Sequence, residues 1–186
     1  HGVAIATARA GNMIGGGDWS ADRLVPDCLR ALEKGRPIVL RYPSSVRPWQ
    51  HVLAPLDGYL KLAERLYDDG PNNQGAWNFG PDDRDAWPVL QVAEKLQQLW
   101  GADRPIVIQE GGAHAEPEAR LLKVDSSKAR ALLGWQPRWD METTLARTVD
   151  WHRAYVAGAD MRQVCAYQIE AYEKGALSHD PARGDI

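Results

Sequence analysis

The chain has 186 residues and a formal net charge of −3 at pH 7, and 44% of its residues are hydrophobic while 25% are charged. This composition is ordinary for a globular protein and excludes a disordered or fibrous chain, and the length suits a single domain. The sequence has no block of Lys or Arg and no apolar stretch of about 18 residues, so it predicts neither a nucleic-acid-binding protein nor a membrane span.

Cysteine and histidine usage gives no sign of a disulfide framework or a metal site. Cys28 and Cys165 lie far apart, and neither has a second Cys or His at a metal-binding spacing. No secretory signal opens the chain, so we expect a reducing, cytoplasmic location. No nucleophile motif and no carboxylate pair is apparent, and the residue pattern therefore names no catalytic group.

The N-terminal segment predicts a buried strand from Val3 to Ala8 that begins almost at once. Apolar strands of this kind normally need neighbouring strands and covering helices, so we expect a cut chain whose remaining sheet lies upstream. The glycine run at 15–17 lacks the residues of a phosphate-binding loop, and a flexible turn is the better interpretation.

Helical periodicity and end signals predict an amphipathic helix behind Arg23, with an apolar face that includes Leu24 and Cys28. The other predicted helices are Pro55 to Tyr67, Trp87 to Trp100, a short helix after Asp125-Ser126-Ser127, Met141 to Val156, and about Asp160 to Lys174. Asp85 and Asp140 are the expected N-caps of the helices that begin near Trp87 and at Met141.

Short strands are expected at 38–40, 50–53, 76–79, 106–109 and 121–124. The first two flank a turn at 42–45 and suggest a hairpin-like pair. Strands this few and short do not make a complete doubly wound sheet, so the sequence predicts a mixed α/β fold. Eight tryptophans are present, and core packing is favoured over pocket walls as their main use.

Four polar residues stand where a ligand could reach them. Asn12 follows the first strand, at the sheet edge where ligands of α/β proteins bind, although Asn in this place is also a common turn residue. Arg23, Arg41 and Arg47 lie at the ends of predicted elements. Each could bind a diphosphate with its guanidinium fork, but an arginine taken alone in such a place is more often a solvated surface cation.

Taken together, several segments are much more specific than any one of these residues. The chain carries a strand followed by Arg9-x-x-Asn12-x-x-Gly15, then GNMIGGGDW at 11–19, RLVPDCLRAL at 23–32 and RPWQHVLAPLDGYLKLAE at 47–64. It ends with WNFGP at 77–81, DSSKARALLGWQPRW at 125–139 and TLARTVDWHRAY at 144–155. In these segments it resembles the extended short-chain dehydrogenase/reductase family of nucleotide-sugar enzymes, and within it the CDP-glucose 4,6-dehydratases.

The resemblance implies that residues 1–186 are the C-terminal part of an extended Rossmann-type fold. This part consists of a mixed α/β substrate-binding domain and a last piece of the parallel sheet, and the N-terminal NAD-binding portion is absent from the chain. The reaction implied oxidises C4 of the hexose with NAD, removes water across C5 and C6, and returns the hydride to C6. NAD is then bound mainly by the missing portion, and we expect a CDP-sugar substrate, a homo-oligomeric parent and no activity of the chain alone.

The resemblance also implies roles for individual residues. Asn12 and Arg47 match positions that contact the substrate diphosphate, and Arg41 should flank the base or the diphosphate. The residues expected to line the nucleotide are Arg23, Leu24 and Val25, and Asp83 matches a nucleotide-side loop loosely. Relatives carry a further cation or His near 115–119, which this chain lacks, and Arg120 or His114 could replace it.

Two other functions remain open at this point. The chain could be part of another NAD-dependent nucleotide-sugar epimerase or dehydratase, because the segments above are shared in the wider family. It could also be a non-catalytic sugar-nucleotide-binding module.

Overall fold

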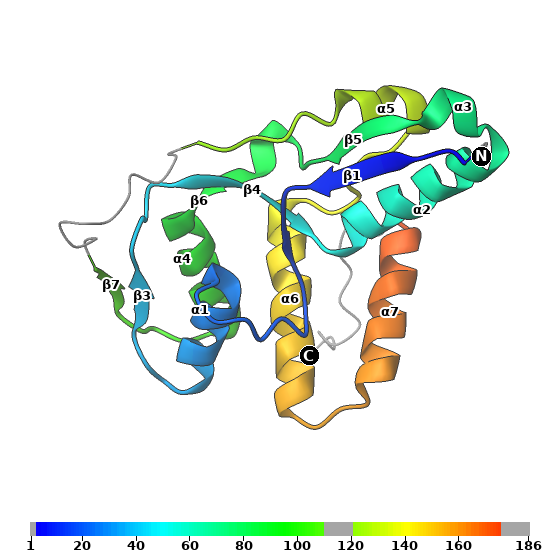
Figure 1. Ribbon diagram of the computed structural model, residues 1–186. Helices are drawn as coiled ribbons and strands as arrows, with labels where there is room; N and C mark the ends of the chain where they lie inside the picture. Colours follow the sequence, from blue (N-terminus) through cyan, green and yellow to red (C-terminus); the bar gives the residue numbers. More distant parts are fainter. Residues whose placement is uncertain (1–2, 110–120, 176–186) are drawn as a thin grey trace.

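The computed structural model describes residues 3–109 and 121–175 (Figure 1). Its helices are α1 (Leu24–Glu33), α2 (Leu53–Asp68), α3 (Gly70–Asn73), α4 (Val89–Trp100), α5 (Ser127–Leu133), α6 (Met141–Val156) and α7 (Met161–Glu173), with one 3-10 turn, η1 (Asp83–Asp85). Its strands are β1 (Ala6–Ala10), β2 (Asn12–Ile14), β3 (Ile38–Leu40), β4 (Val46–His51), β5 (Gly75–Phe79), β6 (Ala86–Pro88) and β7 (Ile106–Ile108).

The described strands form three small sheets. β1 pairs with β5 and β3 pairs with β7, both in parallel, while β4 lies between a parallel β2 and an antiparallel β6. No complete doubly wound sheet is present among residues 3–109 and 121–175, and the predicted mixed α/β fold is confirmed.

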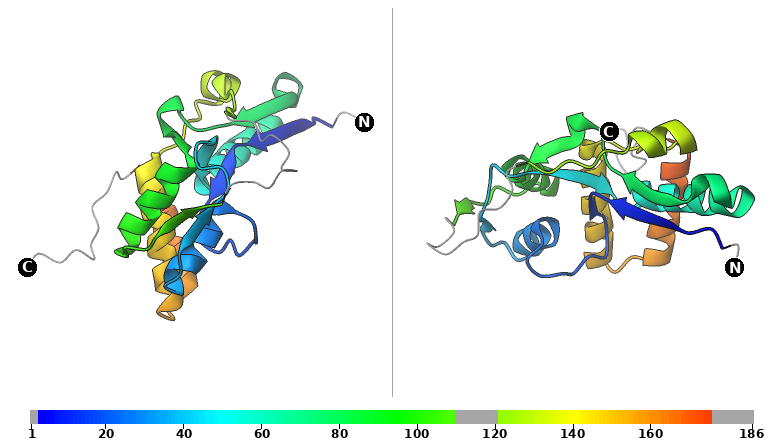
Figure 2. Two further views of the ribbon diagram at one scale, coloured as in Figure 1. Left: turned by 90° about the vertical axis from the view of Figure 1, so that its left-hand side faces the viewer. Right: turned by 45° about the horizontal axis from the view of Figure 1, so that its top comes forward.

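Two hydrophobic clusters hold these elements together. The first lies between the helices α1, α4 and α6 and the strands β2, β3 and β4, and includes Leu32, Leu96 and Val149. The second joins β5 to α2, α5 and α7 around Trp77 and Trp135. Figures 1 and 2 show the consequence, with α4, α6 and α7 packed on one side of the strands. Four of the eight tryptophans, Trp49, Trp77, Trp135 and Trp139, are buried, as the preference for core packing predicts.

The first strand is shifted and much more exposed than its sequence predicts. It runs over Ala6–Ala10 and not from Val3, and the side chains of Val3 and Ile5 are 72% and 67% exposed. The predicted burial is wrong for this chain because β1 has one neighbouring strand among the described residues, β5, and its outer edge is uncovered.

The expected hairpin between 38–40 and 50–53 is also wrong. The second strand begins earlier, at Val46, and β2 and β6 occupy both of its edges, so β3 cannot pair with it. β3 pairs instead with β7, whose residues lie more than sixty positions later in the sequence. The strand predicted at 121–124 is reduced to a single bridge between Val46 and Leu121.

Asp85 does not cap the helix that follows it. Residues 86–88 are extended in β6, where Trp87 lies opposite Arg47, and α4 begins only at Val89. Pro88 disfavours a helical conformation at Trp87, which explains the later start. The carboxylate of Asp85 accepts a hydrogen bond from the N–H of Met141 at 2.9 Å, at the start of α6. The other predicted cap is confirmed, since Asp140 accepts from the N–H of Thr143 at 2.8 Å.

Candidate functional site

Two predicted site residues come from neighbouring parallel strands. Asn12 is the first residue of β2 and pairs in register with Trp49 of β4. Arg47 lies two residues earlier in β4, is only 6% exposed, and donates to its neighbouring carbonyl of Val46 at 2.9 Å. The strands approach closely because residue 11 is glycine, since a Cβ there would lie 2.4 Å from the carbonyl oxygen of Pro48. The pairing therefore brings the amide and the guanidinium to the same face.

Four further predicted residues come from the start of α1 and the end of β3. Arg23 is the N-cap of α1, Leu24 begins the helix, and Val25 is buried against the first hydrophobic cluster. Arg41 follows directly on β3. The amphipathic spacing of α1 turns its buried side toward the first hydrophobic cluster.

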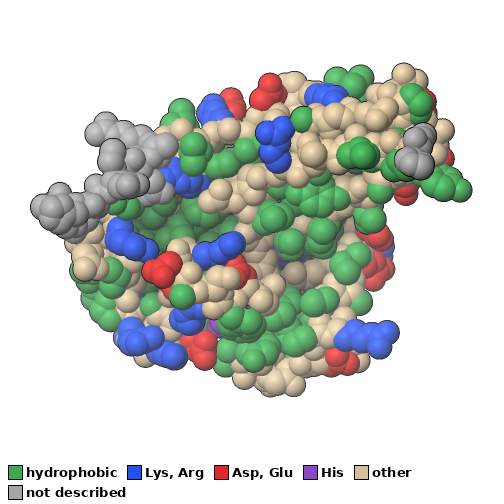
Figure 3. All heavy atoms as spheres, in the orientation of Figure 1, with side chains coloured by type: hydrophobic (Ala, Val, Ile, Leu, Met, Phe, Trp, Pro, Cys, Tyr) green, Lys and Arg blue, Asp and Glu red, His purple; other side chains and the backbone are tan. Residues whose placement is uncertain are grey.

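These segments enclose one cavity of about 650 Å³. Six of the eight residues predicted from the sequence line it: Asn12, Arg23, Leu24, Val25, Arg41 and Arg47. In Figure 3 the corresponding part of the surface is a hollow with hydrophobic side chains inside and both acidic and basic side chains at its rim. Residues far apart in the sequence thus converge on a site that is apolar in part and cationic in part.

The exposed arginines of the cavity are paired with aspartates. Arg41 lies 3.2 Å from a carboxylate oxygen of Asp22, and Arg23 lies 3.8 Å from one of Asp18. Both arginine side chains are more than half exposed, so these pairs contribute little to stability and can exchange for a ligand phosphate at low cost. Burial raises the pKa of Asp18, but hydrogen bonds from Ser20 and the arginine charges outweigh burial, and the pKa is lowered.

One predicted residue, Asp83, does not line this cavity. Asp83 lies at η1, forms an ion pair with Lys123 at 2.9 Å, and lines a separate hollow of about 420 Å³ with Arg130. Arg120 and His114 lie outside the described residues.

The sequence analysis missed several residues that line the cavity. These are the three aspartates Asp18, Asp22 and Asp27 together with Tyr42 and Trp49. Trp49 belongs to the same RPWQHV segment as Arg47, and Tyr42 follows Arg41, so adjacency to the predicted arginines was the available signal. The aspartates carry a sign opposite to that expected of a diphosphate site, which is why charge reasoning passed over them.

The glycine run at 15–17 does not fit a bound dinucleotide. A Cβ on Gly16 would lie 2.0 Å from the ring of Trp151, and one on Gly15 would lie 2.8 Å from the side chain of Val52. These glycines allow close packing against side chains, so they do not form an open phosphate cradle. Within residues 3–109 and 121–175 no group of His, Cys, Asp and Glu could hold a metal ion.

Cys28 is not an activated nucleophile. Burial, together with the nearby charge of Asp27, raises the pKa of the Cys28 thiol to about 12, so the reactive thiolate is suppressed. Cys165 accepts a hydrogen bond from the indole N–H of Trp151 at 3.3 Å. The described part of the chain also contains no helix long and apolar enough to cross a membrane.

Comparisons with known proteins show what the chain is similar to. No family model matches the chain. The chain is 48% identical over 172 residues to a CDP-glucose 4,6-dehydratase of Salmonella typhimurium, in a match that covers 92% of this chain and 47% of that protein. A UDP-glucose 4-epimerase of Streptococcus mutans is 29% identical over 120 residues, which cover 64% of this chain and 34% of that protein. The chain thus spans less than half the length of either relative.

Solved structures agree on the fold. A UDP-glucose 4-epimerase from Thermotoga maritima, determined with UDP-glucose, superposes with a TM-score of 0.67 at 21% identity over 80% of this chain and 46% of that one. A dTDP-glucose 4,6-dehydratase from Bacillus anthracis, determined with NAD, gives 0.64 at 18% identity over 84% and 46%. The predicted fold class is thereby confirmed. The chain is a homologue of CDP-glucose 4,6-dehydratase along 92% of its own residues, and it has the fold of the matching part of nucleotide-sugar dehydratases and epimerases.

Proposed function

We propose that residues 1–186 are the nucleotide-sugar-binding part of a CDP-glucose 4,6-dehydratase, and that the cavity of about 650 Å³ binds the diphosphate end of the CDP portion of the substrate. One observation carries the proposal: six residues predicted from four separate segments line this single cavity. The 48% identity to the Salmonella dehydratase supports the choice of CDP-glucose as substrate.

Each of these residues suits a different part of the sugar nucleotide. Arg47 can hold two diphosphate oxygens with its planar fork, and Asn12 can donate from its amide without adding charge. Leu24 and Val25 offer apolar surface to the nucleoside, and Arg41 lies at the rim where it can exchange its bond to Asp22 for a phosphate oxygen. The chain's share of the reaction is therefore to bind and orient the sugar nucleotide.

The whole reaction needs NAD, which supplies and takes back the hydride. Because the glycine run at 15–17 is packed against Trp151 and Val52, we assign NAD mainly to residues outside this chain. The proposal also includes a cytoplasmic, homo-oligomeric parent enzyme, whose subunit number can be measured by sedimentation.

Calorimetric titration of the 186-residue chain with CDP, UDP and dTDP tests the proposal, with folding checked by circular dichroism. We expect saturable binding at one site, with CDP bound most tightly. Preference for UDP would favour an epimerase instead, the activity named for the relatives at 25–29% identity. No binding of any nucleotide would contradict the proposal.

A further inference from the structure

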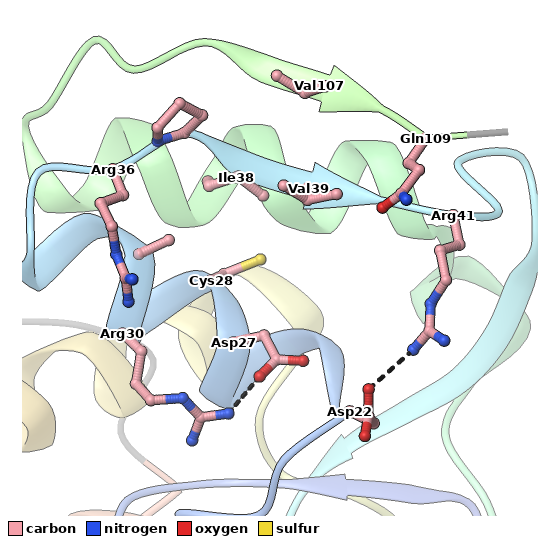
Figure 4. Close-up of a pocket in the computed structure, with 12 residues that line it drawn as sticks. Asp22, Asp27, Cys28, Arg30, Arg36, Ile38, Val39, Arg41, Val107 and Gln109 are labelled. Carbon is pink, nitrogen blue, oxygen red and sulfur yellow. Dashed lines mark hydrogen bonds and ion pairs between the residues drawn. The ribbon is translucent and has the colours of Figure 1, made fainter.

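A second hollow, of about 800 Å³, adjoins the cavity assigned to the diphosphate (Figure 4). The two share four lining residues, Asp22, Asp27, Val39 and Arg41, so they are neighbours with a common wall. If the diphosphate lies beside Asn12 and Arg47, as in the proposed function on which this inference rests, the adjoining hollow can receive the base of the same nucleotide.

The hollow lies between α1 and β3, and both walls suit a flat heterocycle. Cys28 of α1 lies opposite Ile38 and Val39 of β3 in Figure 4, and Ala31 also lines the hollow. The N–H of Ile38 donates to Pro105, and the carbonyl of Leu40 accepts from Gln109, so these backbone groups face β7. Backbone groups alternate along a strand, so the N–H and C=O of Val39 face away from β7, along an edge that no described strand covers.

Backbone groups at this edge cannot by themselves select one pyrimidine. A donor and an acceptor in sequence can pair with cytosine or, after a small shift of the base, with uracil. The same holds for the side chain of Gln109, which also lines the hollow, because its amide can turn to present either group. Selection needs a group that only accepts or only donates.

Asp27 is such a group, and other contacts fix its position. The guanidinium of Arg30 donates to the carbonyl oxygens of Trp19 and Ser20, at 3.0 Å each, and also binds Oδ1 of Asp27. Figure 4 shows Asp27 among the residues that line the hollow, with one carboxylate oxygen bound by Arg30. Among the described residues Oδ2 of Asp27 has no hydrogen-bond partner, so a ligand can use it.

Asp22 is the weaker candidate for the same task. Its side chain is 83% exposed and one oxygen is bound by Arg41 at the rim, whereas the side chain of Asp27 is 46% exposed and lies on α1. Cytosine carries an amino group at C4, a donor, where uracil and thymine carry a carbonyl, an acceptor. A carboxylate accepts hydrogen bonds and donates none. It therefore attracts the amino group of cytosine and repels the carbonyl oxygen of uracil or thymine.

We propose that the carboxylate of Asp27 accepts a hydrogen bond from the exocyclic amino group of cytosine, and that this contact selects CDP-sugars over their uridine and thymidine counterparts. Arg30 acts as a positioning residue, because its guanidinium fixes the carboxylate through Oδ1.

Titration of the 186-residue chain and its variants with CDP and UDP tests the assignment through the ratio of the two dissociation constants. A charge-assisted hydrogen bond predicts that the chain prefers CDP by roughly 10-fold or more. Asp27→Asn should remove most of this preference, because the amide can donate to the uracil carbonyl. Glu170→Gln, which alters an exposed carboxylate paired with Lys174 on α7, should leave the ratio unchanged.

A ligand without the amino group gives a second test that does not depend on any variant. The 5′-diphosphate of the pyrimidin-2-one riboside should bind the unaltered chain roughly 10-fold more weakly than CDP does. Its affinity for the unaltered chain should be about the same as the affinity of CDP for the Asp27→Asn variant. A preference for CDP that persists in Asp27→Asn, or equal binding of the two ligands to the unaltered chain, would overturn the role of Asp27 while nucleotide binding stands. Absence of all nucleotide binding would overturn the proposed function, and this inference with it.

Discussion

Arg47 is the cation of the site that is withdrawn most from solvent. Its side chain lies in β4 and is 6% exposed, whereas Arg23 and Arg41 are at the rim and mostly exposed. Electrostatic interactions strengthen where water is excluded, so Arg47 should contribute more to diphosphate binding than either rim arginine.

Arg47→Ala should therefore weaken CDP binding by roughly 10- to 150-fold, the equivalent of a charge-assisted hydrogen bond of about 1.5–3 kcal/mol. Arg47→Lys should recover only part of the loss, because an ammonium cannot reproduce the two-pronged fork. Calorimetry measures the dissociation constant of CDP for each variant. Arg162→Ala, a change at an exposed position of α7, is the control. An unchanged dissociation constant for Arg47→Ala would remove this residue from the site.

His51 makes stability depend on pH. It is 2% exposed at the end of β4, where burial and, to a lesser degree, the charge of Arg147 lower its pKa to about 3. The folded chain thus keeps His51 neutral while the unfolded chain protonates it below its ordinary pKa of 6.5. The free energy of unfolding should fall as the pH drops below that value, by up to about 1.4 kcal/mol per pH unit.

Urea denaturation between pH 5 and 8 measures this slope. His51→Asn keeps an acceptor for the N–H of Leu53 but cannot be protonated, so its stability should depend less on pH in this range. The variant should be less stable at pH 8 because it loses the edge-on contact with Trp139. A slope equal to that of the unaltered chain would show that other groups cause the acid sensitivity.

Residues that line the cavity could be predicted from the sequence where each one follows or begins a recognisable element. Asn12, Arg23 and Arg41 meet this condition, and the resemblance added Leu24 and Val25. Asp27 could not be predicted, because its position depends on a contact with Arg30 and on a hollow that forms only when β3 packs beside α1. Asp83 was placed on a loose match and lies at a different hollow.

At the scale of elements, helices could be predicted and strand partners could not. The apolar residues of α2 and of α6 recur at helical spacing within each segment. This signal is local, so both helices could be predicted without knowing what they pack against. The partner of β3 is β7, and the distance between them in the sequence leaves no local signal. Both elements that form the adjoining hollow, α1 and β3, were predicted, but their packing was not.

The glycine run between β2 and α1 is a packing device, which a substitution can test. Gly16→Ala would force the ring of Trp151 to move, since the added Cβ would lie 2.0 Å from it, and overpacking of this kind costs about 1–3 kcal/mol of unfolding free energy. Gly158→Asn is the matched control, because nothing lies within 4 Å of its Cβ position and Asn tolerates its positive φ of 74°. Thermal denaturation should show a clear loss for Gly16→Ala only. Equal stabilities would contradict the tight packing.

At the scale of the whole molecule, the exposed edge of β1 has a consequence for solution behaviour. Val3 and Ile5 are largely exposed beside a strand whose outer edge has no described partner. Such edges associate with other chains, so we expect the 186-residue chain to self-associate as its concentration rises. Sedimentation of the chain and of an Ile5→Lys variant measures this, and the variant should associate less. A monomer at all concentrations would show that the edge is protected.

We also expect that the chain alone does not convert CDP-glucose to its 4-keto-6-deoxy product. The described residues include no dinucleotide loop, and the sequence contains no Tyr-x-x-x-Lys motif for acid–base chemistry. Absorbance of the keto product in alkali, with NAD added, is the assay. Turnover by the purified chain would contradict this division of work.

The central claim is that separate segments form one nucleotide-sugar site, and hydrogen–deuterium exchange with and without CDP-glucose tests it most directly. We expect the sugar nucleotide to slow amide exchange in four places together: around Asn12, at the start of α1, at the end of β3, and around Arg47. Exchange around Asp83 and Lys123, at the separate hollow, should not change. Protection at that hollow alone, or at none of the four segments, would contradict the claim.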